Sequence, residues 1–153
     1  VAKSTSTLMF DAGILYWTGY RSLRIAAAVR HFGPEVEYID ENFPLPQTFN
    51  LGIAGYLIAP QNSLLISSPS QSLLVAFDLV HPRDFDQQYN MGLEYSFGEL
   101  VFIRGGYKLN YDTAGLCLGA GLRLRGISVD YSFNDYGKYL DAVHRFTIGA
   151  SLD

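Results

Sequence analysis

The feature that most constrains the fold is an alternation of apolar residues with small or polar ones, which runs through nearly the whole chain. Successive side chains of a β-strand point to opposite faces, so a period of two predicts strands rather than helices. The prolines all fall between the alternating segments, where no ladder hydrogen bond is needed. The pattern predicts an all-β fold, an antiparallel up-and-down meander of about nine strands at residues 7–17, 22–33, 47–58, 72–80, 88–97, 100–109, 114–124, 126–133 and 143–152.

The two faces of these predicted strands differ in chemistry. One face is apolar and carries no charged residue. The other consists mainly of small residues, namely Gly13, Ala26, Ala28, Gly52, Ala54, Ala76, Gly92, Gly106, Gly119, Gly121, Ser128, Ser132, Gly149 and Ser151. Charges of both signs are interspersed with them: Asp11, Arg24, Arg30, Asp78, Glu94, Arg104, Lys108, Arg123, Asp130 and Arg145. An apolar face toward lipid and a polar face toward a wet interior are typical of a transmembrane β-barrel. A soluble β-sandwich or barrel, with the apolar face turned inward, is the alternative.

Composition excludes several other classes of protein. Aromatic residues make up 14% of the chain, which excludes a disordered polypeptide. The net charge of −4 argues against a nucleic-acid-binding surface. Cys117 is the single cysteine, so no internal disulfide framework is expected. No uncharged apolar run approaches the roughly 18 residues of a transmembrane helix. Because no shift in composition marks a second domain, residues 1–153 are predicted to be a single β-barrel domain.

The expected connections alternate in length. Short ones lie around 18–21, 98–99 and 125, and longer ones around 33–46, 81–88, 110–113 and 134–142. Outer-membrane barrels have short periplasmic turns and longer external loops, which is the same alternation. The segment 59–71 breaks the rule because it is long on the short side. Bacterial barrels have even strand numbers, so a count of nine predicts the C-terminal part of a larger barrel whose N-terminal strands are missing.

Several segments resemble a known family. The stretch His31–Pro46, followed directly by a predicted strand, is similar to a signature of the PorV/PorQ-like outer-membrane proteins. That family belongs to the wider group of fatty-acid-transporter-like (FadL-type) barrels. Later segments are similar to the same family in the same order, namely Asp78–Pro82, Arg104–Tyr111, Gly119–Leu122, Val129–Ser132 and His144–Phe146.

The resemblance implies a non-enzymatic outer-membrane barrel of PorV/PorQ type, located in the bacterial outer membrane and requiring no cofactor. It implies a role in protein secretion or surface attachment, like that of the type IX secretion system. The lipid bilayer is then one partner, and secreted cargo or other secretion-system proteins are further partners. The FadL-type superfamily suggests an alternative, passive transport of hydrophobic small molecules across the membrane.

Few residues suggest chemistry. His31, His81 and His144 lie at predicted strand ends or in loops without metal-ligand spacing, and no serine occupies a nucleophile elbow. We therefore predict neither catalytic nor metal-binding residues. The densest cluster of carboxylates lies in the loop 33–46, where aromatic residues flank it. This loop is a candidate for docking a partner through Glu35, Glu37, Tyr38, Asp40, Glu41 and Phe43, with a loop packed on the barrel mouth as the simpler reading.

The charges predicted on the small-residue face also allow two readings. They could line a conduction path through the lumen, or they could form a network of ion pairs that plugs it. Charges withdrawn from water need partners, so we favour the network.

Overall fold

The computed structural model describes residues 6–34, 36–38, 41–111, 115–137 and 141–151, and these ranges contain strands and turns but no helix. The long strands are β1 (Phe10–Trp17), β2 (Arg24–Phe32), β5 (Thr48–Ala59), β7 (Gln71–Pro82), β8 (Gln88–Phe97), β9 (Val101–Leu109), β10 (Leu116–Leu124), β11 (Ile127–Asn134) and β12 (Val143–Ala150). Three short strands were not predicted: β3 (Val36–Tyr38), β4 (Glu41–Phe43) and β6 (Ile66–Ser67). In the described part of the chain, no helix is long and apolar enough to cross a membrane.

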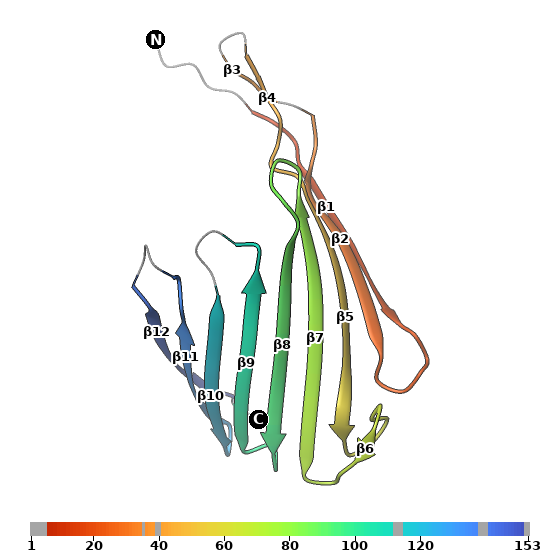
Figure 1. The fold of residues 1–153 in the computed structure, drawn as a ribbon, viewed down its shortest axis with the longest axis vertical. Helices are drawn as coiled ribbons and strands as arrows, with labels where there is room; N and C mark the ends of the chain where they lie inside the picture. The colour runs from red at the N-terminus through yellow and green to blue at the C-terminus, as the bar shows by residue number, and fades with distance from the viewer. Residues whose placement is uncertain (1–5, 35, 39–40, 112–114, 138–140, 152–153) are drawn as a thin grey trace.

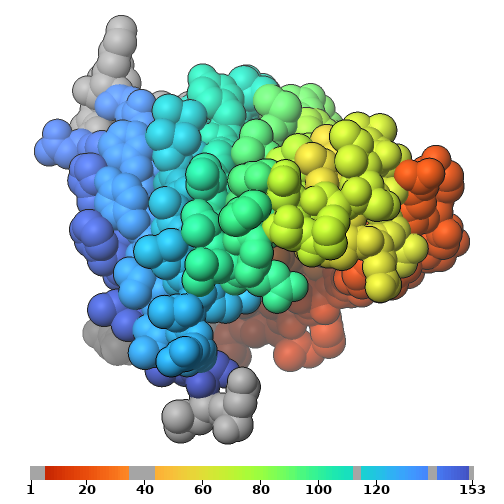
Figure 2. Space-filling model, turned by 90° about the horizontal axis from the view of Figure 1, so that it is seen from below, coloured from red at the N-terminus to blue at the C-terminus, as the bar shows by residue number. Residues whose placement is uncertain are grey.

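The long strands form one antiparallel meander, in the order β1-β2-β5-β7-β8-β9-β10-β11-β12 (Figure 1). The predicted all-β class and its up-and-down topology are confirmed. Contacts between elements are made only by neighbours in the sheet, so the sheet is a single layer. Seen from below, the strands succeed one another across the molecule in chain order (Figure 2). β1 and β12 are the two edges and the sheet is not closed, so barrel closure stays a prediction.

The connections follow the predicted alternation in length only in part. At the lower end of the sheet in Figure 1, turns of two and three residues join β10 to β11 and β8 to β9, but six residues (18–23) join β1 to β2, one more than the five residues (83–87) of the upper β7–β8 connection. The β10–β11 turn consists of Arg125 and Gly126, both with positive φ (47° and 78°). Two positive φ values define the type I′ turn, whose twist matches that of the flanking strands.

The long lower segment between β5 and β7, which the sequence left unexplained, pairs with the part of β5 that extends beyond β2. The pairing of β2 with β5 ends at Arg24 and Ala54, whereas β5 continues to Ala59. The chain then folds back, and β6 pairs in parallel with this extension at Ile58–Ile66 and Ala59–Ser67. Backbone carbonyl groups of β5 that would otherwise be unpaired thereby accept hydrogen bonds from the returning segment.

Side chains hold this folded-back segment in place. The Arg21 guanidinium, in the β1–β2 turn, donates hydrogen bonds to the carbonyl oxygens of Ser63 and Leu64, both at 2.7 Å. Leu64 in turn lies against Gly55, where an added Cβ would come within 2.7 Å of the leucine methyl group. The contacts of Arg21 and Leu64 therefore join the β1–β2 turn and the lower end of β5 to the folded-back segment.

The sheet has almost no buried apolar core. Among the described residues, the buried hydrophobic side chains are Leu45, Ala59 and Phe102. A soluble sandwich would bury the apolar face under a second layer. No described segment supplies that layer, so the apolar face needs a partner outside the sheet.

Candidate functional site

The apolar face of the sheet is more exposed than the face behind it. In β10, Leu116, Leu118 and Leu122 are 41–57% exposed, whereas Gly121 between them is buried. In β5, the exposed residues are likewise Phe49, Leu51 and Ile53. Exposure rises to 75% at Phe146 and 78% at Ile148 on the edge strand β12. This is the reverse of the burial pattern in soluble proteins, which rarely expose large continuous apolar patches.

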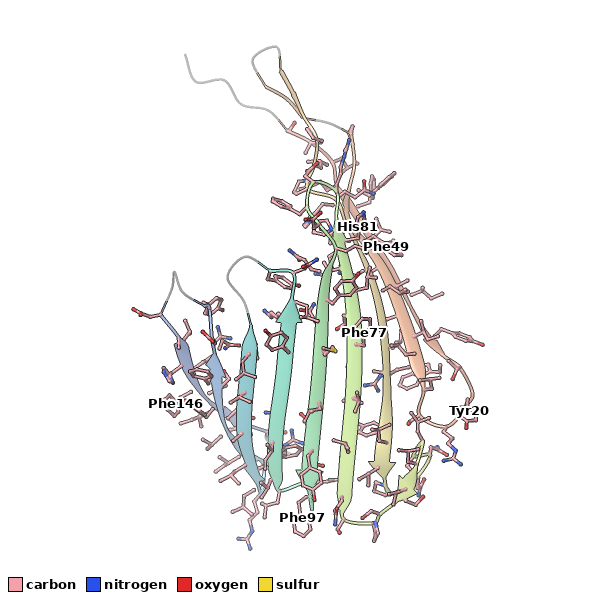
Figure 3. The ribbon with its side chains drawn as sticks, in the orientation of Figure 1. Tyr20, Phe49, Phe77, His81, Phe97 and Phe146 are labelled. Atoms are coloured by element: carbon pink, nitrogen blue, oxygen red, sulfur yellow. The ribbon has the colours of Figure 1, made fainter. Side chains whose placement is uncertain are left out.

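Aromatic residues on this face lie toward the strand ends and also at mid-strand, as do Tyr131 and Phe146, whose ring centroids are 4.9 Å apart. Figure 3 places Phe49 and His81 at the upper ends of β5 and β7, with Phe97 at the lower end of β8 and Tyr20 in a lower turn. Phe77 lies between these levels and stacks on Tyr89 of the neighbouring strand, with ring centroids 6.0 Å apart.

The opposite face carries the predicted small and charged residues. Strand pairing places Gly52 next to Asp78, Asp78 next to Asn90, and Asn90 next to Lys108 in one row across four strands. The face is less uniform than the sequence analysis proposed, because Trp17, Tyr56 and Phe102 also lie on it. The alternation itself identifies Phe102, since it is in phase with Arg104 and Lys108 along β9.

Three of the predicted charges form a closed cluster, which we call the charge triad: Glu94, Arg104 and Asp130. Arg104 Nε lies 2.6 Å from Glu94 Oε2 on β8, the residue directly opposite it in the sheet. Its Nη1 lies 2.6 Å from Asp130 Oδ1 on β11. Asp130 is two strands away from Arg104, so the arginine side chain must cross β10.

Two glycines of β10 make this crossing possible. Gly119 is paired with Arg104, and an added Cβ at Gly119 would lie 3.4 Å from the arginine Cβ. Gly121 is paired with Asp130, and a Cβ there would lie 2.5 Å from Asp130 Oδ1 and 3.3 Å from Arg104 Nη1. Any side chain at Gly121 would occupy the space in which the ion pair forms.

Phe102 supports the triad from below. Its ring is 9% exposed and is paired with Gly121, whose lack of a side chain leaves it room. The guanidinium carbons of Arg104 and Arg123 lie 5.4 Å and 5.0 Å from the ring centroid, within the range of cation–π attraction. Phe102 was not among the residues predicted for this face, although its phase with Arg104 and Lys108 along β9 places it there.

A second polar cluster lies on the same face at β2, β5, β7 and β8. A hollow of about 360 Å³ is lined there by Arg30, Asn50, Asp78 and Asn90, and its remaining lining is mostly small and includes Ala26, Ala28 and Gly52. The Asp78 carboxylate leans over Gly52 toward β2. The Oδ1 atoms of Asn50 and Asn90 are buried and accept no hydrogen bond from the described residues. We call this cluster the polar hollow.

The other predicted charges on this face make separate contacts. Asp11 Oδ1 accepts a hydrogen bond of 2.7 Å from the His31 backbone N–H at the β1–β2 bulge. Arg24 lies over the rings of Trp17 and Tyr56, at 5.6 and 6.0 Å.

The remaining two charges lie toward the upper ends of their strands. Lys108 lies 5.6 Å from the Tyr111 ring centroid, and Arg145 is exposed on β12 opposite Ser132. The predicted charges therefore split into one linked triad and several separate contacts, rather than one network.

The candidate docking loop contains the β3–β4 ribbon, which extends beyond the upper end of the main sheet (Figure 1). Its backbone pairs Glu37 with Asn42, Tyr38 with Glu41, and Val36 with Phe43. Glu35 and Asp40 lie outside the described residues. The structure thus gives four of the six predicted docking residues a place on one two-stranded ribbon.

The histidines lie apart from one another. His31 Nδ1 is 3.3 Å from the Pro46 carbonyl oxygen, and His144 Nδ1 is 2.8 Å from the Tyr131 hydroxyl. His81 lies at the upper end of β7. In the described ranges, no three His, Cys, Asp or Glu side chains come close enough together to hold a metal ion.

Comparisons of the chain with protein-family models, with curated proteins and with solved structures find no match. The resemblance to PorV/PorQ-like proteins therefore stays a prediction from the residues that carry it.

Proposed function

We propose that the chain forms part of the wall of a transmembrane β-barrel in a bacterial outer membrane. The observation that carries the proposal is the reversed exposure: Leu51 and Ile53 are over 40% exposed, while Asn50 and Gly52 beside them are half-buried. An apolar face of this extent is stable only against another apolar phase. Lipid provides such a phase, while the face with the charge triad meets the water of the lumen.

The dimensions of the strands support this proposal. A transmembrane β-strand needs about 9–11 residues when it is tilted. The long strands have 8 to 12 residues, from β1 with 8 to β5 and β7 with 12. Backbone groups inside a bilayer must all be paired, so the open edges at β1 and β12 require further strands before the sheet can lie in lipid.

For the role of this barrel we propose protein secretion or surface attachment, without enzymatic activity. Its support is the resemblance to PorV/PorQ-like proteins together with the β3–β4 ribbon, which projects beyond the sheet and offers an edge to a partner. The partner proposed for this ribbon is a secreted cargo protein or another component of the secretion system.

The test replaces residues 35–43 of the intact protein with a Gly/Ser linker and measures recovery of secreted proteins in a pull-down from the outer membrane. We expect recovery to fall strongly, because the ribbon would be lost. The matched control replaces the upper connection 135–142, and recovery should persist there. Recovery unaffected by the change at 35–43 would remove the ribbon from the proposed role.

Transport of hydrophobic molecules remains the alternative role. An apolar binding site in the lumen would favour it, since ligand sites are mostly apolar. The hollow on the lumen side is instead lined by Arg30, Asp78 and two asparagines. Uptake of a labelled fatty acid into liposomes containing the intact protein would restore this alternative.

A further inference from the structure

The hydrogen-bonded rows of the sheet run obliquely to the line that joins the middles of its strands. One row crosses seven strands on the apolar face and pairs, in turn, Tyr16, Ile25, Ile53, Phe77, Met91, Tyr107 and Leu116, all of them exposed. This row meets β1 one residue before its lower end, but it meets β10 at the first residue of its upper end. The strands are therefore staggered in one direction across the sheet (Figure 1).

The size of this stagger follows from standard strand geometry. Tyr16 lies two and a half residues below the middle of β1, and Leu116 lies four residues above the middle of β10. At about 3.3 Å per residue, the row is displaced by roughly 21 Å along the strands, while six steps of about 4.8 Å separate β1 from β10. The ratio gives an inclination of about 37°, which lies within the tilt of roughly 35–45° that strands have in transmembrane barrels.

We propose that the lipid-facing belt of the protein is oblique, following the middles of the strands and crossing the hydrogen-bonded rows at about 37°. Its partner is the hydrocarbon of the bilayer, and the oblique belt rests on the proposed barrel wall. Residues of one row then lie at different depths in the membrane. Ile53, Phe77 and Phe146 belong to the middle of the bilayer because each lies within one residue of the middle of its strand. Leu116 belongs to the upper part of the bilayer.

The positions of charged residues favour an oblique belt over one parallel to the rows. Asp135 directly follows β11, and its N–H donates a 2.9 Å hydrogen bond to the Leu116 carbonyl oxygen, so Asp135 continues the row of Phe77. At the other end, Arg21 lies in the turn that follows Trp17, roughly 10 Å below the same row. A belt about 25 Å tall and centred on this row would take both charged residues into hydrocarbon, where charges are costly.

An oblique belt brings both charges to the borders of the hydrocarbon. Asp135 and Arg21 then lie about 12 Å or more from the midplane of a belt about 25 Å tall. Outside the β3–β4 ribbon, the other charged residues in the described connections are Arg83, Asp84, Asp86, Glu99, Arg125 and Asp141. The apolar face of the long strands has no Asp, Glu, Lys or Arg among its described residues. A belt without charges and with charged connections at both borders complements a slab of hydrocarbon between two polar layers.

The test measures the depth in a bilayer of a fluorophore attached to single cysteines of the intact protein, with Cys117 replaced by serine. Phe77→Cys, Leu116→Cys and Phe146→Cys are reconstituted into vesicles whose lipids carry bromine at a shallow, a middle or a deep position of the acyl chain. The pattern of quenching gives the depth of each label. We expect Phe77→Cys and Phe146→Cys near the midplane and Leu116→Cys about 10 Å closer to a surface. Figure 3 labels Phe77 and Phe146, which lie on strands far apart in the sheet.

A matched control comes from the same row. Ile53 is paired with Phe77 and lies near the middle of β5, so the label at Ile53→Cys should have the depth of the label at Phe77→Cys. Where Leu116→Cys fails to fold, Tyr107→Cys takes its place, because Tyr107 belongs to the same row and lies two residues above the middle of β9. Its label should be displaced from the midplane by about half as much.

Equal depths at Phe77 and Leu116, with Phe146 displaced from both, would overturn the oblique belt and leave the proposed barrel wall standing. Absence of quenching by brominated lipid at every position would overturn both, because the apolar face would then not meet lipid. A difference of about 10 Å within one row, with none between Phe77 and Phe146, is the result that the oblique belt predicts.

Discussion

The two faces of the sheet consist of alternating residues of the same strands, but their side chains are stabilised in different ways. The polar face partly satisfies its own charges, because Arg104 of β9 joins Glu94 of β8 and, across the glycines of β10, Asp130 of β11. On the apolar face, no other part of the sheet covers the side chains, and Ile148 is 78% exposed. A single-layered sheet can pair its own charges laterally, but it can bury apolar side chains only against something else. The identity of that covering phase decides what the protein is.

The largest expected effect comes from placing a charge on the apolar face. Val129→Arg should lower the free energy of unfolding in bilayers by about 2–4 kcal/mol if the residue lies near the middle of the membrane. The neighbouring substitution Ser128→Arg should cost less, because its side chain enters the polar face and meets only the repulsion of the paired Arg123. Denaturant titration of the protein folded into lipid vesicles measures both changes. Equal penalties at the two positions would break the distinction between the faces.

A smaller effect is expected from filling the space over Gly121 in which Arg104 and Asp130 form their ion pair. Gly121→Val should destabilise the protein by roughly 1–3 kcal/mol, because the new side chain overpacks the space in which Asp130 meets Arg104. Gly92→Val is the matched control, since its nearest neighbour to an added Cβ is 4.0 Å away. Urea titration compares the two variants. A control that loses as much stability as Gly121→Val would show that the triad is not the cause.

The smallest effect should follow removal of one charge from the triad. Glu94→Gln is expected to cost about 0.2–1 kcal/mol, because the side chains of this pair are a third exposed and water weakens their attraction. The loss should shrink as salt concentration rises. Stability curves at low and high salt measure this dependence. A loss that does not vary with salt would indicate that Glu94 acts through packing rather than charge.

Much of the architecture could be predicted from the sequence because one signal repeats along the chain. The period of two places all nine long strands within a few residues of their observed bounds, and the phase of the apolar residues gives the face of each strand. Hairpin connections then leave the meander as the simplest topology. Local pattern and sheet topology agree in these segments, which is why the prediction succeeds.

The features that were missed depend on contacts between distant segments. The parallel pairing of β6 with the end of β5 follows from the unequal lengths of β2 and β5, which no local pattern records. The triad depends on register, because Arg104 reaches Asp130 only when Gly119 and Gly121 lie between them. The polar hollow likewise requires knowledge of which strands are neighbours. The phase rule could have found Phe102, Asn50 and Asn90, had it been applied to large residues on the polar face.

The most direct test of the central claim is chemical labelling of single cysteines by a probe confined to the lipid phase. Cysteine would be introduced at Leu93, Val129 or Ser128 in intact protein whose native Cys117 is replaced by serine and which is reconstituted into bilayers. Leu93 and Val129 lie on the apolar face, at 50% and 44% exposure, and should be labelled, while Ser128 on the polar face should not. Labelling at Ser128 with none at Leu93 and Val129 would contradict the assignment of the apolar face to lipid.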